Sequence, residues 1–417
     1  MIESWDAIAE NLARFEPQSS FDDVEKFIES NDDFVLVGQP GPASGVALDL
    51  EKKHAKKTKC FVPMGAWSLA AAGRIEQANP QEIDWRKEKI IIASYHGLEI
   101  AWKLIKNYGL RCLREFVFFD HVYLLNNPLF RNSAGALFYE YYTRRQDDFT
   151  KAYQLLSDEL SRITYAKILK YRTNAFNPEL MTPGDLPTPL EIQYEYEKNA
   201  KIFADLVPNN ISPPLRGEIA FKLSLDAYSY LDVVSPRGKR VILNIGAYNN
   251  SSAPLALSAK GGRVYAFEPQ ADKHADNIAL SKVFAEIIPV PKGVWKESTR
   301  LSFKIDESAT GGTTASYVSD KGDSQIEVVS IDDFVKENGI KPDFIKMDTE
   351  GAELEGLEGG KETIKEYLPD LAISIYHHPS HLHLIPEMIR KFDERYRIFI
   401  GHKYFDFMES VLFATLA

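Results

Sequence analysis

The sequence predicts an α/β protein with two Rossmann-like sheet domains and a mainly helical region between them. Short apolar runs of strand length alternate with helical patterns in the first 125 residues and again after residue 232. Between residues 128 and 172 the strand pattern is absent. Alternating strands and helices favour a parallel, doubly wound sheet. Because 417 residues exceed one ordinary core, we expect two or three domains.

The first predicted domain, residues 1–125, is a Rossmann-like α/β unit. Its expected strands are 33–38, 60–62, 89–93 and 115–120, with helices up to residue 30, from the first strand to residue 57, and at 98–108. Gly38, Gly41 and Gly45 follow the first strand, but their spacing is not that of a dinucleotide fingerprint. Pro40 and Pro42 also remove two N–H groups that could bind phosphate. The pattern favours a domain that binds no dinucleotide, or that binds some other small ligand.

The connecting region, residues 126–232, is predicted to be mainly helical. Phe149, Tyr153, Leu156, Leu160 and Ile163 recur at the spacing of one helix face. A series of prolines then predicts a linker near 174–189, and helical patterns resume at 190–206 and continue to about 231.

The last predicted domain, residues 233–417, alternates again. Five strands are expected at 240–245, 263–267, 287–290, 343–347 and 371–376. Two more, 396–400 and 410–414, have no helix between them and predict an antiparallel hairpin at the end of the sheet.

Composition excludes several classes of protein. The chain has 49 Lys and Arg against 60 Asp and Glu, a net charge of −11, which argues against binding nucleic acid or anionic membrane by bulk charge. Two cysteines are too few for a disulfide framework. The first residues do not resemble a signal peptide, and no apolar run approaches the ~18 residues of a membrane helix. We expect a cytoplasmic protein that neither enters a membrane nor binds nucleic acid, and that could form a homo-oligomer.

The strongest local pattern is the first strand–turn–helix of the last domain. The strand contains Asn244, Gly246 permits a tight turn, and Glu268 ends the next strand 22 residues later. An acid at that distance is placed to accept hydrogen bonds from ribose hydroxyls. The pattern suits any adenosine cofactor, and the alternative is an acid that merely solvates a strand end.

Seven ordered segments of the same region carry a resemblance to a known family: VILNIGAYNNSSAPLAL, RVYAFEP, IPVPKGVW, VVSIDDFV, FIKMDTEGAELEGLEGG, LAISIYHHP and HKYFDFMESVLFA. They resemble the FkbM family of S-adenosylmethionine-dependent methyltransferases, over about residues 235–417. The resemblance implies a seven-stranded sheet with the cofactor over the ends of its first strands. It also implies O-methylation, with a sugar or glycan hydroxyl as the expected acceptor.

Carried over residue by residue, the resemblance implies a cofactor site. Glu268 would bind the ribose, Asp348 would face the methyl group, and the remaining cofactor contacts would come from Asn244, Gly246, Ala247, Tyr248, Asn250, Pro269, Gly293 and Val294. Two positions depart from the family pattern, which usually has Asp at 244 and Gly at 250. An Asn at 244 loses a negative charge near the cofactor's ammonium group.

Acidic residues and histidines supply the candidate catalytic groups. Asp348, Glu350 and Glu353 lie where a strand turns into a helix, so Glu350 and Glu353 are either substrate ligands or ordinary first-turn acids. His377 and His378 follow the fifth strand and should reach the crevice that holds Asp348. We expect His377 to be the general base, with its pKa raised by Asp348, and His378 to be the alternative base. His381 and His383 lie close by, but the spacing matches no known tetrahedral site, and we expect no metal.

Two rival functions remain open. The departures at Asn244 and Asn250 would suit a non-catalytic binding protein that keeps the fold and has lost methyl transfer. The first domain could instead carry a nicotinamide-dependent activity.

Overall fold

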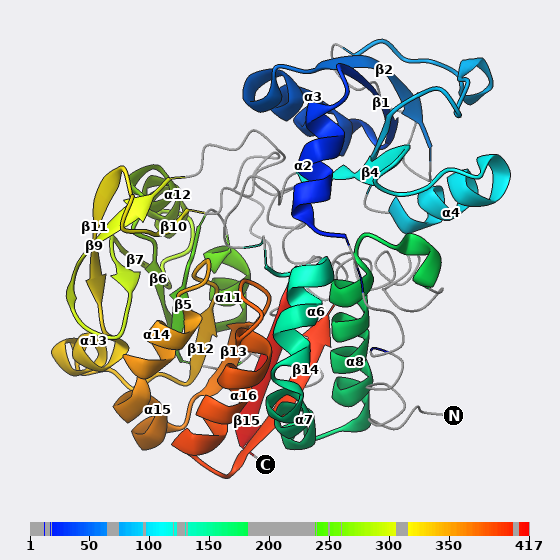
Figure 1. Ribbon diagram of the computed structural model, residues 1–417. Helices are drawn as coiled ribbons and strands as arrows, with labels where there is room; N and C mark the ends of the chain where they lie inside the picture. Colours follow the sequence, from blue (N-terminus) through cyan, green and yellow to red (C-terminus); the bar gives the residue numbers. More distant parts are fainter. Residues whose placement is uncertain are drawn as a thin grey trace. The chain divides into compact units, whose positions relative to one another are not determined.

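The structure, a computed structural model, describes residues 12, 17, 19–64, 75–94, 97–119, 121–122, 130, 132–181, 238, 240–248, 251–259, 261–305, 316–402 and 408–416 (Figure 1). These residues form two compact units. The first contains the described residues up to Arg144 together with 169–181, and the second contains 145–168 and every described residue from 238 onward. Both units are α/β. The second half of the linker predicted near 174–189 and all of the helical stretches expected between 190 and 231 lie outside the described residues.

The first unit is built on a four-stranded parallel sheet in the order β2-β1-β3-β4. Its strands are β1 (Asp33–Gly38), β2 (Lys57–Pro63), β3 (Ile90–Ala93) and β4 (Phe116–Phe118). Its helices are α2 (Phe21–Glu29), α3 (Pro40–His54), α4 (Gly97–Tyr108) and α6 (Gly135–Thr143), with short 3-10 turns at Pro80–Glu82 and Pro178–Leu180. A Cβ on Gly38 would lie 2.4 Å from the carbonyl oxygen of Ala93, so this glycine permits close packing of β1 on β3.

The second unit contains a seven-stranded sheet in the order β14-β15-β13-β12-β5-β6-β7. Its strands are β5 (Val241–Ile245), β6 (Arg263–Phe267), β7 (Ile287–Val290), β12 (Phe344–Met347), β13 (Asp370–Ser374), β14 (Tyr396–His402) and β15 (Ser410–Leu416). Strands β5, β6, β7, β12 and β13 are parallel, and β15 pairs antiparallel with both β13 and β14. Strand β6 therefore lies on one side of β5 and β12 on the other. The strand order reverses between β5 and β12, and the carboxyl ends of these two strands form the switch point of the sheet.

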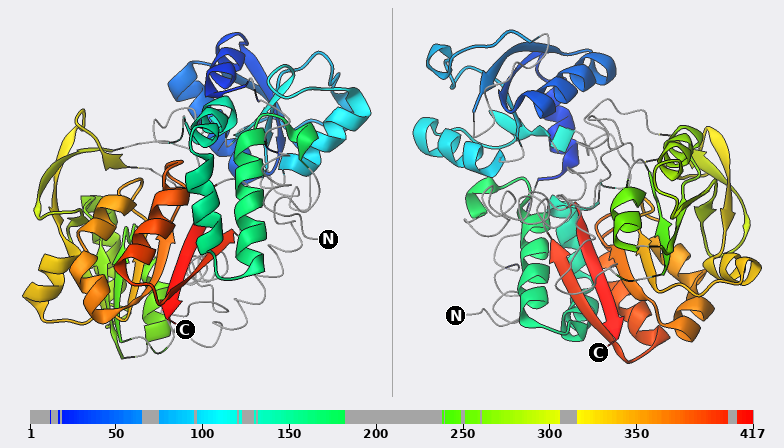
Figure 2. Two further views of the ribbon diagram at one scale, coloured as in Figure 1. Left: turned by 60° about the horizontal axis from the view of Figure 1, so that its bottom comes forward. Right: turned by 180° about the vertical axis from the view of Figure 1, so that it is seen from behind.

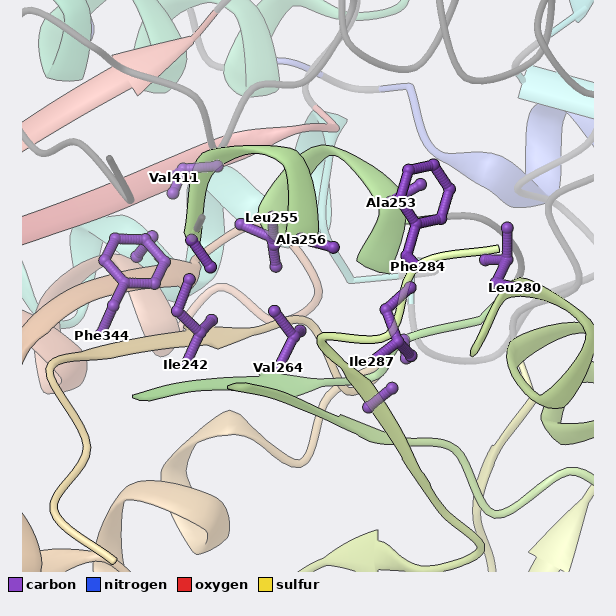
Figure 3. Packing of buried hydrophobic residues seen from close by; sticks show 14 of the residues in the cluster. Ile242, Ala253, Leu255, Ala256, Val264, Leu280, Phe284, Ile287, Phe344 and Val411 are labelled. Atoms are coloured by element: carbon purple, nitrogen blue, oxygen red, sulfur yellow. The ribbon is translucent and has the colours of Figure 1, made fainter. Parts of the chain in front are cut away.

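Helices cover both faces of this sheet (Figures 1 and 2). On one face lie α11 (Ser252–Ala259) and α12 (Ala271–Ser281); on the other lie α14 (Glu353–Glu358), α15 (Lys361–Tyr367) and α16 (His381–Phe392). Figure 3 shows the core beneath α11, where Ala256 lies over Ile242 and Val264 of the strands and Ala253 lies beside Phe284. These five side chains are at most 4% exposed. The helix lies close to the sheet because its inward positions include two alanines.

A second sheet of the same unit was not predicted. It has the order β10-β9-β11-β8, with β8 (Gly293–Val294), β9 (Thr299–Lys304), β10 (Tyr317–Val318) and β11 (Ser324–Val329), and α13 (Ile331–Asn338) follows it. Strand β9 has few apolar residues, and only Phe303 of its six residues is buried. That weak pattern explains why apolar runs did not reveal the strand.

The single helix face predicted through 149–163 is wrong. The structure has two helices there, α7 (Gln146–Leu155) and α8 (Glu159–Asn174). The chain breaks at Ser157, whose N–H donates to Ile398 O over 2.8 Å and whose hydroxyl accepts from Ile398 N over 2.8 Å. These bonds attach the break to strand β14. Leu160, expected on the buried face, is 67% exposed.

Candidate functional site

The turn after β5 brings two predicted site residues into direct backbone contact. Gly246 has φ +74°, and a Cβ on it would lie 1.7 Å from the carbonyl oxygen of Asp348. No other residue type fits a backbone that is both left-handed and this close to its neighbour. The N–H of Asp348 also donates to Ile245 O over 3.0 Å. The switch point of the sheet therefore joins the predicted cofactor turn to the predicted acceptor residue.

Glu268 is fixed at the end of β6, beside this turn. One carboxylate oxygen accepts from the N–H of Tyr248 and the other from the N–H of Gln270, each over 2.8 Å. The residue is 6% exposed. Burial raises the pKa of Glu268 to about 7, although the two backbone donors and Lys346 oppose the shift. Each oxygen keeps a further lone pair, so the carboxylate can still accept from two hydroxyls of a ligand.

Asn244 lies in a buried polar network and not on an open surface. Its side chain is fully buried, and Nδ2 donates to Ser251 Oγ over 3.1 Å and to Ser252 Oγ over 2.9 Å. Both serine hydroxyls donate onward, Ser251 to Ala247 O over 2.5 Å and Ser252 to Asn277 Oδ1 over 3.1 Å. A carboxylate at position 244 would face two hydroxyl oxygens whose protons are already used. The network therefore accounts for an amide at this position.

The remaining predicted cofactor residues lie around the same strand ends. A Cβ on Gly293 would be 3.6 Å from Pro269 Cγ, so these two residues are neighbours. Val294 is 4% exposed and pairs with Val329 of β11, which makes it a packing residue in this structure. Tyr248 has φ +46°, and Lys273 Nζ lies 4.8 Å from its ring centroid. Asn250 lies outside the described residues.

Two hydroxyl groups donate hydrogen bonds to Asp348 on the acceptor side. Its Oδ1 accepts from Ser374 Oγ over 2.9 Å and from the Tyr376 hydroxyl over 3.2 Å. Lys346 Nζ lies 4.0 Å from Oδ2. The side chain is 20% exposed, so a ligand can reach it.

His377 meets Asp348, as the sequence predicts, but two glutamates lie closer to its ring. Nε2 is 3.6 Å from Asp348 Oδ1 and 3.1 Å from Glu350 Oε2, and Nδ1 is 3.0 Å from Glu353 Oε1. Burial alone would lower the pKa of His377, but the charges of Glu353 and Glu350 outweigh it and hold this pKa well above its ordinary value. The neighbouring carboxylates therefore favour the protonated imidazole, whose side chain is fully buried.

Glu353 occupies a position that does not suit the substrate contact expected from the sequence. Burial would raise the pKa of Glu353, but the adjacent His377 charge lowers it to about 2. One of its oxygens accepts from Thr349 N over 2.7 Å, and the other lies 3.3 Å from His381 Nδ1. The side chain is fully buried and orients His377 through Nδ1, the ring nitrogen that faces away from Asp348 and Glu350. Glu350, also expected to bind substrate, is 31% exposed and faces the same ring.

His378, the predicted alternative base, points to the start of α16. Its Nδ1 accepts from Ser380 N over 3.1 Å, and the residue is exposed. His377, and not His378, lies beside Asp348.

Sequence reasoning missed two charged residues of this cluster. Lys346 is 3% exposed in the middle of β12, and a lysine inside an apolar strand is the signal that could have revealed it. Glu409 follows a segment outside the described residues and directly precedes β15, which pairs with β13. Burial and the charge of Asp348 raise the pKa of Glu409 to about 8.

Asp348, Glu353 and His377 each offer one ligand atom within 4.8 Å of the others, a spacing that would also suit a cation. In the structure, however, both ring nitrogens of His377 face carboxylates, so the charge of the imidazolium already offsets part of the negative charge of these acids.

No helix in the described part of the chain has the length and apolar character needed to cross a membrane.

Comparison with known proteins matches the same region. Residues 244–398 fit the sequence model of the methyltransferase FkbM domain. This part of the chain is an FkbM methyltransferase domain. The crystal structure of methyltransferase FkbM from Methylobacillus flagellatus superposes with a TM-score of 0.58 at 18% identity, over 98% of this chain and 97% of that one, which shows a shared fold.

A curated relative is the hexuronic acid methyltransferase AglP of Haloferax volcanii. It is 31% identical to this chain over 122 residues. The match covers 28% of this chain and 49% of AglP, so the chain spans about half the length of that relative.

Proposed function

We propose that the FkbM domain transfers a methyl group from S-adenosylmethionine to a hydroxyl oxygen, and that the acceptor is a sugar or glycan. One observation carries the proposal: Gly246 and Asp348 touch at the switch point of the sheet, with Glu268 on one side and His377 on the other. Ligands of open α/β sheets bind at this point. The sugar acceptor is supported by the similarity to AglP, which is a hexuronic acid methyltransferase.

The residues around β5 and β6 fit the cofactor. Glu268 presents a carboxylate that two backbone donors hold in place, with lone pairs left for the two ribose hydroxyls. Gly246 has no side chain, so a ligand can approach the backbone of the turn. The bound cofactor would supply an electrophilic methyl group. Asn244 belongs to a structural network in this chain, so its difference from the family pattern is no argument for lost activity.

On the acceptor side we assign distinct roles to the three groups around His377. Asp348 accepts a hydrogen bond from the acceptor hydroxyl and takes its proton as the oxygen attacks, because Ser374 and Tyr376 hold its carboxylate in a single orientation. His377 is buried, so it acts through Asp348 and Glu350 and not on the substrate. Glu353 fixes the ring from the opposite side. This revises the expectation that His377 is itself the base.

Calorimetric titration with S-adenosylhomocysteine tests the proposal. We expect one site per chain. Absence of binding at millimolar ligand would contradict the methyltransferase proposal. If binding occurs, incubation with S-adenosylmethionine and cell-derived glycans should then yield methyl ethers that base does not cleave. Base-labile methyl esters would show that a carboxylate, and not a hydroxyl, is the acceptor.

A further inference from the structure

A buried lysine connects the two halves of the proposed site. Lys346 lies in β12 between β5 and β13, paired in register with Asn244 and Ala372. It is 3% exposed. Its ammonium donates to the carbonyl oxygen of Gly246 over 2.8 Å and lies 4.0 Å from Asp348 Oδ2. A buried ammonium is costly unless it is paired and hydrogen-bonded, and here both partners belong to the site.

We propose that Lys346 is a positioning residue that holds the cofactor turn and the acceptor carboxylate at a fixed separation. The inference rests on the proposed function, because only a transferase needs the two groups in register. The ammonium fixes the turn through the Gly246 carbonyl and fixes Asp348 through its charge. Methyl transfer depends on placing the acceptor oxygen in line with the methyl group, so a small shift of either group reduces the rate.

The charges around Lys346 support the same role. Its ammonium opposes the burial that raises the pKa of Glu268, and it acts likewise on Glu409. The charge of Asp272 raises the pKa of Glu268, whereas the hydrogen bonds from the N–H groups of Tyr248 and Gln270 lower it, as Lys346 does. Lys346 is therefore the cation that favours an ionised carboxylate at the ribose position. Its loss should shift the pH range in which Glu268 can accept from two hydroxyls.

An ordinary structural lysine would predict a different outcome. Such a residue would stabilise the fold, and its replacement would lower the melting temperature without changing how ligand affinity depends on pH. The relevant comparison is therefore between Lys346→Met, which removes charge and donor, and Lys346→Arg, which keeps both. Lys361→Met, at an exposed position on α15, is the matched control.

The first experiment measures S-adenosylhomocysteine affinity between pH 6 and 9 for these variants. We expect Lys346→Met to bind about tenfold or more weakly at neutral pH, the effect of a lost charge-assisted hydrogen bond, and to recover part of that loss at higher pH. Lys346→Arg should restore the parental pH profile, and Lys361→Met should match the parent throughout. Equal affinities and superimposable pH profiles for Lys346→Met and the parent would overturn the inference.

A second experiment needs no ligand. Hydrogen exchange of peptides covering 244–248 and 346–350 should be faster in Lys346→Met than in the parent, and both peptides should change together. Unchanged exchange in either peptide overturns the positioning role, even if the parent chain fails to bind the cofactor product and the proposed function falls. If Lys346→Met does not fold, hydrogen exchange of the parent chain with and without ligand tests the positioning role. Added S-adenosylhomocysteine should then protect both peptides, and protection of the first alone contradicts the inference.

Discussion

Replacing Glu268 by Ala should weaken the binding of S-adenosylhomocysteine by about 1–3 kcal/mol, or about 5- to 150-fold. The magnitude follows from what the carboxylate can do. Each oxygen already accepts one backbone N–H over 2.8 Å, from Tyr248 and Gln270, and has capacity for one ribose hydroxyl. Two charged hydrogen bonds to the ligand are lost, and water can replace them only in part.

The same carboxylate predicts a pH dependence. Burial raises the pKa of Glu268 to about 7, and hydroxyl donors prefer the ionised form. Parental affinity should therefore rise with pH up to about 7 and level off above it, whereas the Glu268→Ala variant should show no such rise. Calorimetry at several pH values measures both effects, with Glu337→Ala on the exposed side of α13 as the control. If Glu268→Ala binds as tightly as the parent, the assignment of the end of β6 is incorrect.

Further substitutions test the other parts of the site. Asn244→Asp should lower the free energy of unfolding by about 1–3 kcal/mol without tightening cofactor binding, and an unchanged urea midpoint would contradict the buried network. Gly246→Ala should prevent folding or destabilise strongly, because its Cβ would meet Asp348 O at 1.7 Å, whereas Gly339→Ala, with φ +60° and no atom within 4 Å, should cost only about 1 kcal/mol in the same urea titration. His377→Gln should reduce kcat about 10²-fold while the dissociation constant of S-adenosylhomocysteine changes less than about threefold. Because the pKa of His377 is held well above its ordinary value, turnover should not rise through pH 6–7 on its account, and a steep rise there would restore His377 as the direct base. Dialysis against a chelator should leave both turnover and affinity unchanged, and loss of turnover that magnesium or zinc restores would show that a cation is needed at Asp348.

The sequence predicted the sheet of the second unit well because buried parallel strands are short and continuously apolar. Strands expected at 240–245, 263–267 and 287–290 lie at Val241–Ile245, Arg263–Phe267 and Ile287–Val290. Glycine and acidic residues at the strand ends then located the turn and Glu268. These signals are local, so one sequence suffices to detect them.

Long-range contacts explain what the sequence did not predict. Helical spacing continues through Ser157, but the hydrogen bonds of that residue to Ile398, 241 residues away in the chain, break the helix. The pairing of Glu353 with His377 likewise depends on α14 and the end of β13 meeting in space. In the sequence, a run of acids is equally typical of first-turn helix charge and of substrate ligands. Its third possible role, the orientation of His377 by Glu353, becomes visible only when the burial of Glu353 is known.

Asn244 shows that a departure from a family pattern can have a structural reason. From the sequence, the missing charge counted against cofactor binding. In the structure its amide supplies two donors to serine hydroxyls whose protons are engaged elsewhere. The residue type is therefore set by Ser251 and Ser252, which a pattern of single positions does not capture.

A crystal structure of the chain with bound S-adenosylhomocysteine would show directly whether methyl transfer takes place at this edge of the sheet. We expect one ligand at the carboxyl edge of β5 and β6. Its ribose hydroxyls should lie within hydrogen-bonding distance of both oxygens of Glu268, and its sulfur should face Asp348. A ligand bound elsewhere, or one whose sulfur points away from Asp348 and His377, would contradict the assignment of this edge as the site of methyl transfer.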